Sequence, residues 1–385
     1  MRYPKSKSIQ GTHYLGTMKE NKIPVYDIIT SDGLNQIIGY VKHINASDGT
    51  VLYRGQCDLY DHVIPSIEHA PENYLSNTKR LEDTITKLFF DESINNYFAW
   101  DELVIGWETY IKIILEAVLQ HYGAATNSLD LVDNHWAALW FSLFRFDKTQ
   151  KQYIRRSKSD FVSDAEKIAF DPYYPPFEDV PPPKPDGYQL SSQDIDKLRQ
   201  IHKNTRKPLE DLREELINKN NCRNYAKYNS TLKSFYLKKN EHEKRVSDFE
   251  RRCNMAHSYL FLYLAETNES EVQGLYLGKK SYTVDLRKAL PSTFLRPVAQ
   301  HGWIVKGKDK NYSFDSSILC VLRLPVELVD EMLGTGSLLS QNNFFPEYCV
   351  DEGYKVLLTR QEDSGLTDMK KTILLPKNMI STIFY

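Results

Sequence analysis

The sequence predicts a mixed α+β fold, because strand-like segments stand near both ends of the chain and amphipathic helices lie between them. The segments 23–30 and 50–54 are short, rich in β-branched and aromatic residues, and bounded by turn residues. Strand-like segments return after residue 255, from "SYLFLYLA" through "YTVDL" and "GWIVKG" to "SILCVLRLP". A chain of 385 residues with 41% hydrophobic residues is long enough to bury a large core.

The first half of the chain contains most of the predicted helices of this fold. Apolar residues recur at helical spacing in "LNQIIGYVKHIN", "RLEDTITKLFFDESINNYFAW", "GWETYIKIILEAVLQHYG" and "HWAALWFSLFRF". We expect the third of these to end at Gly123 with a left-handed cap, and the fourth to begin after Asn134 as N-cap. A short helix, "PVELVDEMLGTG", should begin at Pro325.

Cysteine usage and hydropathy exclude several classes of protein. The five cysteines are far apart, form no CxxC pair and have no histidines at zinc-finger spacing, so neither a disulfide framework nor a metal site is expected. There is no run of about 18 apolar residues, and the N-terminal sequence lacks the apolar region of a signal peptide. We therefore expect a soluble, cytoplasmic protein with no membrane partner.

The middle of the chain differs in composition from the rest. Residues 170–187 include seven prolines, which is typical of a stiff linker or surface loop. Residues 197–255 carry 16 Lys or Arg against 8 Asp or Glu, with tyrosines and phenylalanines between them. This basic segment fits a pair of solvated charged helices better than it fits a surface for a nucleic-acid or protein target, and both interpretations stay open.

Four segments, in order, resemble the FRG domain family. "YRGQ" (53–56) with "IPSI" (64–67) is similar to the family's opening motif, and "LQHYGAATNSLDLVDNHWAALWFSL" (119–143) resembles its QHYG and ALxFA segment. "LRPVAQHGWIV" (295–305) and "LRLPVELVDEMLGTGSLLSQNNFFPEY" (322–348) resemble its two later blocks. The resemblance implies an FRG-like α+β domain made of residues 1–150 and 255–385. The segment 150–255 would then be an insertion, with the Pro-rich loop followed by basic helices.

The FRG pattern itself resembles the ADP-ribosyltransferase fold, which implies a split antiparallel sheet flanked by helices. It further implies an enzyme that uses NAD as a substrate to modify a protein or nucleic acid, or an NAD glycohydrolase, in the manner of a bacterial or phage defence effector or toxin. Because this is an analogy of fold, the activity stays open. The alternative is a non-catalytic module that senses a nucleotide or mediates a protein contact.

By this resemblance, Arg54 binds the phosphates or ribose of NAD. A guanidinium at a strand end is a fixed charged fork suited to a pyrophosphate, and Gly55 beside it would let a ligand approach the backbone. The alternative is a structural salt bridge from Arg54 to Asp58, Asp61 or Asp130. The candidate ligand-binding residues are Tyr53, Arg54, Gly55, Gln56, Tyr122, Thr126 and Arg296.

The candidate catalytic residues are Gln300, Asp130 and His121. Gln300 falls near the position at which the ADP-ribosyltransferase pattern has a glutamate, and an amide carries no charge to stabilise an oxocarbenium-like transition state. Asp130, Asp133 or Glu266 could supply that charge, whereas carboxylates near helix starts are usually caps. His121 could act as a general acid or base, or it could pair with the end of its helix. His301 is a weaker candidate of the same kind.

Three positions depart from the family pattern in the second segment: Ala125 replaces a proline, Asn127 an arginine and Leu131 a tryptophan. If that arginine contacts a ligand in relatives, this chain binds the ligand differently or not at all.

Overall fold

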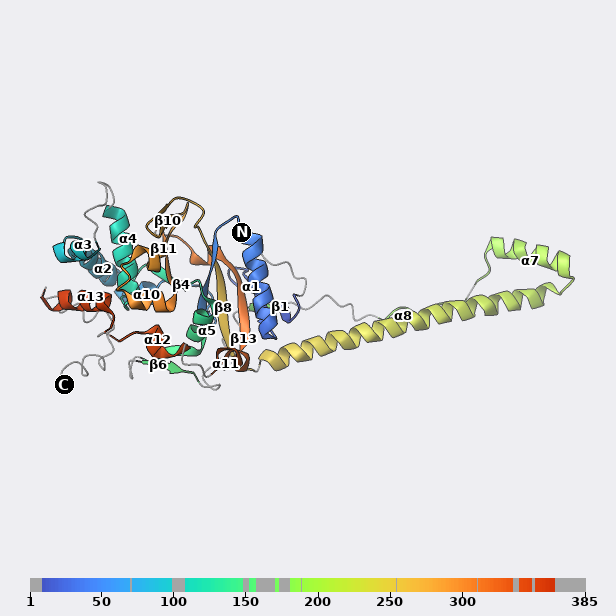
Figure 1. Cartoon of the computed structure of the whole chain (residues 1–385). Helices are drawn as coiled ribbons and strands as arrows, with labels where there is room; N and C mark the ends of the chain where they lie inside the picture. The colour runs from blue at the N-terminus through green and yellow to red at the C-terminus, as the bar shows by residue number, and fades with distance from the viewer. Residues whose placement is uncertain are drawn as a thin grey trace. The chain divides into compact units, whose positions relative to one another are not determined.

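The computed structural model describes residues 9–69, 71–98, 108–147, 152–156, 170–172, 181–187, 189–253, 255–309, 311–334, 339–347 and 350–363 (Figure 1). Its contacts divide the chain into two compact units, residues 1–173 with 255–385, and residues 174–254. The two units are described separately below.

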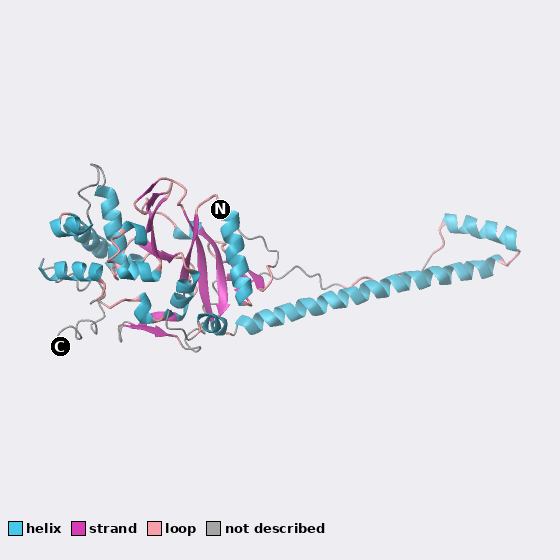
Figure 2. Cartoon of the chain, viewed as in Figure 1, coloured by secondary structure: helices cyan, strands magenta, loops and turns pink. Residues whose placement is uncertain are grey.

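The first unit is built on one large, mostly antiparallel sheet (Figure 2). Eleven of the described strands form it, in the order β7-β1-β2-β13-β8-β3-β4-β12-β11-β10-β9, and the β2–β13 pair is parallel. The mixed α+β fold is therefore confirmed. The strands are β1 (Thr12–Met18), β2 (Pro24–Ile28), β3 (Thr50–Gln56), β4 (Ser128–Val132), β7 (Phe170–Pro172), β8 (His257–Ala265), β9 (Glu271–Val272), β10 (Leu275–Leu277), β11 (Ser281–Asp285), β12 (Gly302–Gly307) and β13 (Ile318–Pro325). A separate hairpin consists of β5 (Phe144–Asp147) and β6 (Gln152–Arg155).

Helices and sheet enclose two hydrophobic clusters. The first cluster joins β2, β13, β8 and β3 to α1, α5 and α11, and the second joins β10, β11 and β12 to α2, α3, α4, α9 and α13. The α-helices of this unit are α1 (Ser31–Asn45), α2 (Tyr74–Phe89), α3 (Glu92–Phe98), α4 (Glu108–His121), α5 (His135–Leu143), α9 (Leu286–Ala289), α10 (Leu295–Gln300), α11 (Val326–Leu333), α12 (Gln341–Phe344) and α13 (Glu352–Asp363). Short 3₁₀ turns are η1 (Ser66–His69), η2 (Pro71–Asn73) and η5 (Phe314–Ser317).

The predicted helix ends agree with the structure in two places and differ in a third. Gly123 follows α4 with a φ of 100°, and the Asn134 side chain accepts a hydrogen bond from the Trp136 amide at the start of α5. The prediction that α5 continues through "FRF" is wrong, because Phe144 begins β5 and pairs with Arg155. The chain thus turns from helix to strand where only helical periodicity was expected.

The sheet nearly separates between β3 and β4. Strand β3 pairs with β8 along its whole length, from Thr50 to Gln56, but with β4 only through Tyr53 and Val132. β4 in turn pairs with β12 over five residues. Past Tyr53 the two strands diverge, so the residues at the end of β3 have no strand neighbour on that side within the described part of the chain.

The second unit contains the basic segment. Helix α7 (Ser192–Thr205) begins with a capping box between Ser191 and Asp194, and it packs on α8 (Leu209–Cys253). The chain segments of β6 and β7, which lie beyond the sequence boundary at residue 150, pair with β5 and β1 of the first unit. Backbone hydrogen bonding therefore ties the start of the expected insertion to the first unit.

Within the described residues, no helix combines the length and the apolar character that crossing a bilayer requires.

Candidate active site

A cavity of about 990 Å³ lies where β3 and β4 diverge. Its wall comes from the end of β3 and the loop after it, the end of α4, β4, the α5–β5–β6 segment, α10, and the segment from α12 to α13. Nine of the ten candidate residues from the sequence line it, namely Tyr53, Arg54, Gly55, Gln56, His121, Tyr122, Asp130, Arg296 and Gln300. The tenth, Thr126, is fully buried behind the wall.

Arg54 reaches across the gap between the two strands. Its Nη1 donates to the carbonyl oxygen of Asp130 over 2.8 Å, beyond the single residue pair through which β3 pairs with β4. Among the described residues, no carboxylate lies within ion-pair distance of the guanidinium, and Asp58 is paired with Arg156 instead, at 2.7 Å. Burial lowers the pKa of Arg54 from its ordinary value, and Asp130 opposes the shift. The alternative of a structural salt bridge to Asp58, Asp61 or Asp130 is therefore not what the structure contains.

Asp130 has one carboxylate oxygen, Oδ1, that is buried and lacks a hydrogen-bond partner among the described residues. Burial raises the pKa of Asp130, while a hydrogen bond from Gln120 and the charge of Arg54 lower it. The side-chain oxygen Oε1 of Gln120 accepts a hydrogen bond from the Thr126 hydroxyl, which holds the Gln120 side-chain amide in place. Thr126 thus supports the wall through Gln120 instead of touching the cavity.

His121, at the end of α4, is held neutral. Burial, and then the charge of Arg296, lower the pKa of His121 to about 3. Its Nε2 is buried without a hydrogen-bond partner among the described residues. At neutral pH the neutral ring can therefore form a hydrogen bond with a ligand. It cannot act as an imidazolium acid, because it carries only one ring proton.

Arg296 lies among aromatic rings. Its guanidinium carbon is 4.8 Å from the ring centre of Tyr122, 5.1 Å from that of Phe345 and 5.3 Å from that of Tyr354. Tyr122 is itself stacked on Tyr354 and donates its hydroxyl to Asp351 over 2.7 Å. Tyr122 therefore supports Arg296 and does not offer an open ring face to a ligand.

Gln300 and Gly55 have structural roles at the wall of the cavity. The Gln300 side-chain amide donates to the carbonyl of Phe344 over 2.7 Å, which joins α10 to α12. A Cβ atom on Gly55 would lie 1.7 Å from the carbonyl oxygen of Ala138. Glycine at this position thus allows α5 to pack on β3, which is a different reason from the ligand approach expected from sequence.

The cavity has an aromatic wall that sequence reasoning missed. It consists of Phe141, Phe144, Tyr153 and Phe345, and Tyr153 stacks on Phe345 with ring centres 4.5 Å apart. Burial raises the pKa of Tyr153 to about 12. The alternation of aromatic and polar residues in "FRF" after α5 is the local signal for this strand.

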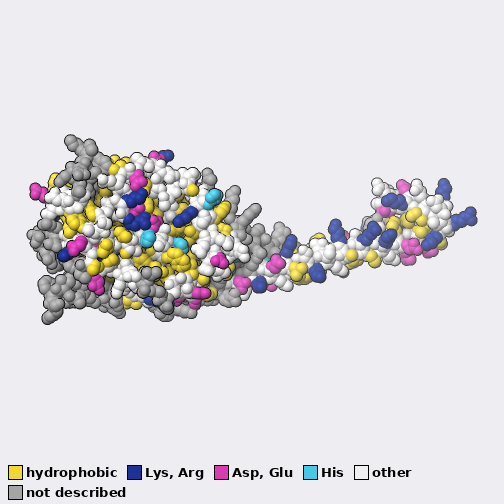
Figure 3. All heavy atoms as spheres, viewed as in Figure 1, with side chains coloured by type: hydrophobic (Ala, Val, Ile, Leu, Met, Phe, Trp, Pro, Cys, Tyr) yellow, Lys and Arg dark blue, Asp and Glu magenta, His cyan; other side chains and the backbone are white. Residues whose placement is uncertain are grey.

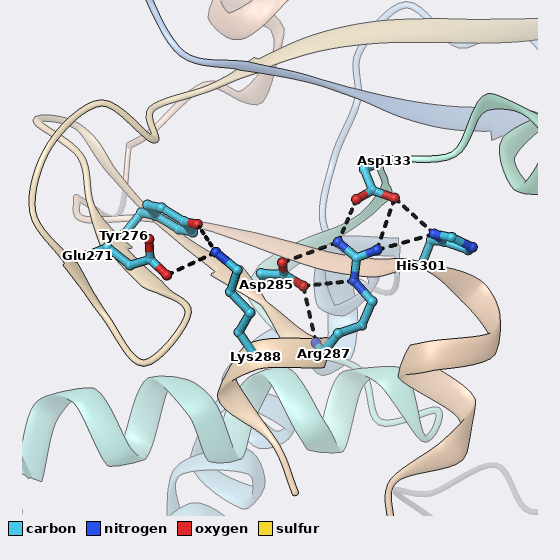
Figure 4. A network of polar contacts seen from close by, with 7 residues as sticks. All are labelled: Asp133, Glu271, Tyr276, Asp285, Arg287, Lys288 and His301. Atoms are coloured by element: carbon cyan, nitrogen blue, oxygen red, sulfur yellow. Dashed lines mark hydrogen bonds and ion pairs between the residues drawn. The ribbon is translucent and has the colours of Figure 1, made fainter. Parts of the chain in front are cut away.

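The other acidic candidates and His301 do not line the cavity. Asp133 pairs with Arg287 and His301 in a polar network that also includes Asp285 (Figure 4). Glu266 accepts hydrogen bonds from the backbone amides of residues 280 and 281. Both carboxylates are therefore occupied by structural contacts. Of the three positions that depart from the family pattern, Leu131 lines the cavity, and Ala125 and Asn127 are absent from its wall.

The model of the FRG domain matches residues 49–151. The sequence resemblance is confirmed over this range, which includes β3, the loop after it, α4, β4 and α5. The two later segments of the resemblance lie outside the matched range. No curated protein and no solved structure matches the chain.

Proposed function

From the FRG domain at residues 49–151, and from the cavity that it helps to form, we propose that the protein binds NAD and cleaves its nicotinamide–ribose bond. The ADP-ribose is then transferred to a protein or nucleic-acid acceptor. The observation that carries the proposal is the cavity itself, which combines an arginine without a carboxylate partner and an aromatic wall. Its volume of about 990 Å³ is at the upper end of small-molecule sites and suits a dinucleotide.

Each part of NAD has a matching group in the wall. The guanidinium of Arg54 suits the pyrophosphate, because its Nε has no hydrogen-bond partner among the described residues. The rings of Phe144, Tyr153 and Phe345 suit the flat bases. Asp130 suits the ribose, where a carboxylate stabilises the positive charge that develops as nicotinamide leaves.

The positive charge of α8 is the observation that favours a large anionic acceptor. Between residues 216 and 240 this helix carries Lys219, Arg223, Lys227, Lys233, Lys238 and Lys239 but no Asp or Glu. Figure 3 shows Lys and Arg side chains along this unit. A nucleic acid or an acidic protein surface would meet such a helix favourably, with binding that weakens as salt rises.

Nicotinamide release tests the proposal. Purified protein incubated with NAD should release nicotinamide, measured by chromatography, and Arg54→Ala should lower the release at sub-saturating NAD by about 30-fold while the melting temperature changes little. Arg155→Ala, which removes an exposed arginine paired with Asp330, is the control and should keep full activity. No release from the wild-type protein would refute the proposed reaction.

The second candidate is a module that binds the nucleotide without turnover. It is favoured by Gln300, which is uncharged and already committed to the Phe344 carbonyl. In that case NAD should raise the melting temperature by mass action, and no nicotinamide should appear.

An effector role, which the resemblance implies, has its own test. Expression of the wild-type protein in bacteria should slow growth, and expression of Arg54→Ala should not.

A further inference from the structure

His62 and Asp315 form a pair at the wall of the cavity. The Nδ1 atom of His62 lies 2.6 Å from Oδ2 of Asp315, although the two residues are 253 positions apart in sequence. The His62 side chain lines the cavity and is 56% exposed, whereas that of Asp315, in η5, is 9% exposed. A nearly buried carboxylate thus holds an imidazole that solvent and ligands can reach.

The loop that carries His62 is anchored without the imidazole. The amide of Val63 donates to Oδ1 of Asp315 over 2.9 Å, and Asp58 pairs with Arg156. At its far end, the amide of Ile67 donates to the Thr126 carbonyl over 3.2 Å. Since one oxygen of Asp315 already holds the loop, the contact through its other oxygen orients the ring.

This orientation suits proton acceptance at the other ring nitrogen. When Nδ1–H donates to Asp315, the neutral ring presents Nε2 as a lone-pair acceptor, and this atom has no hydrogen-bond partner among the described residues. The hydrogen bond to Asp315 has the largest effect and raises the pKa of His62. Burial, the next largest, lowers it, and the charges of Asp315, Asp61 and Glu20 raise it. His121, whose pKa is about 3, would be a much weaker base.

We propose that His62, oriented by Asp315, is the general base that activates a hydroxyl acceptor for ADP-ribosyl transfer. The inference rests on the proposed function and names its acceptor class. The acceptor oxygen attacks C1′ of the ribose, and the C1′–N bond to nicotinamide breaks, with its electron pair leaving on neutral nicotinamide. The acceptor proton passes to Nε2 of His62 and then to solvent. A carboxylate acceptor, already ionised, would need no such base.

The variant that isolates this role is His62→Asn. The Asn amide nitrogen can donate to Asp315 as Nδ1 does, so the loop contact is kept, but the side chain cannot accept the proton. Nicotinamide release should fall by about 100-fold to 10,000-fold, the effect typical of a lost general base. NAD affinity and the melting temperature should stay close to wild type. The control His43→Asn changes an exposed histidine of α1 outside the cavity and should have no effect.

The pH profile separates a base from a structural contact. In the wild type, release should rise with pH as His62 loses its proton, with a midpoint above about 6.5, and His62→Asn should lose this rise. In Asp315→Asn the rise should move to lower pH, because the carboxylate that raises the pKa of His62 is gone.

The outcomes separate this inference from the proposed function. If the wild-type protein releases nicotinamide and His62→Asn releases it at the same rate and with the same pH profile, His62 is not the general base, and the proposed function still stands. If His62→Asn fails to fold, His62→Gln replaces it, with the same criterion. Wild-type protein that releases no nicotinamide would overturn both.

Discussion

Arg54 and Arg287 are both partly buried arginines beside the sheet, yet their surroundings are opposite. Arg287 donates to both oxygens of Asp285, over 3.0 Å and 3.2 Å, and also contacts Asp133 and His301 (Figure 4). Arg54 donates to one neutral backbone carbonyl, that of Asp130. Arg287 is therefore ion-paired with two carboxylates, while Arg54 has no ion pair among the described residues and only the nearby charge of Asp130 to oppose its own.

The difference separates an arginine that stabilises the fold from one that is available to a ligand. The network around Arg287 joins the end of β4 to the start of α9 and to the turn before β12, so its contacts hold three parts of the chain together. At the cavity, buried polar atoms of Arg54, Gln56, His121, Asp130 and Arg296 lack partners among the described residues. Unpaired buried groups cost stability, which favours a functional reason for keeping them.

In the comparison of these two regions, the largest expected effect comes from Asp130→Asn, at the cavity. The change removes the negative charge that would face the oxocarbenium-like transition state, so nicotinamide release should fall by about 100-fold. Since burial raises the pKa of Asp130, the folded protein disfavours this charge, and urea unfolding at pH 7 should show equal or slightly higher stability. Asp196→Asn, at an exposed position of α7, is the control. A variant with full turnover would show that Asp130 is not the catalytic carboxylate.

Arg287→Ala should lower the stability of the protein and leave nicotinamide release unchanged. It leaves the nearly buried Asp285 and the neighbouring Asp133 without their cation, which should lower the free energy of unfolding by about 2 kcal/mol. The next residue offers a matched control, because Lys288 forms an exposed pair with Glu271 that should contribute at most about 1 kcal/mol. Urea unfolding measures both variants. Loss of nicotinamide release by folded Arg287→Ala protein would contradict the separation of the two regions.

The last prediction concerns acid stability and His121, where no effect is expected at neutral pH. In the unfolded chain His121 binds a proton below about pH 6.5, but in the folded protein its pKa is about 3. The unfolded state therefore binds more protons between these values, and wild-type stability should decline as pH falls, by at most about 1.4 kcal/mol per pH unit from this residue. His121→Gln removes this dependence, so urea midpoints from pH 6.5 to pH 4 should fall less steeply. If the urea midpoints of the wild type and His121→Gln fall in parallel as the pH is lowered, His121 is charged in the folded protein.

The elements that could be predicted from sequence are those with a strong local pattern. The helical spacing of α1 and α4, the apolar strands β8 and β13, and the motif around Arg54 are all visible within short segments. The motif residues of β3, α4, β4 and α10 then line one cavity, as the FRG resemblance led us to expect.

The features that could not be predicted depend on contacts between distant segments. The pairing of His62 with Asp315 joins two ends of the domain, and no local signal links them. The need for Gly55 depends on how closely α5 packs on β3. Tyr153 enters the cavity wall because β5 and β6 form a hairpin, whose first strand follows directly on the apolar helix α5 and is too short to stand out from it in sequence.

Equilibrium binding by calorimetry tests the central claim most directly, with an NAD analogue whose nicotinamide–ribose bond cannot be cleaved in place of NAD itself, so that turnover does not consume the ligand. We expect one analogue per chain for the wild type and for Arg287→Ala, with equal affinities. Arg54→Ala should bind about 30-fold more weakly, since a charge-assisted hydrogen bond contributes about 2 kcal/mol. Equal affinity for the analogue in the wild type and Arg54→Ala would contradict the account.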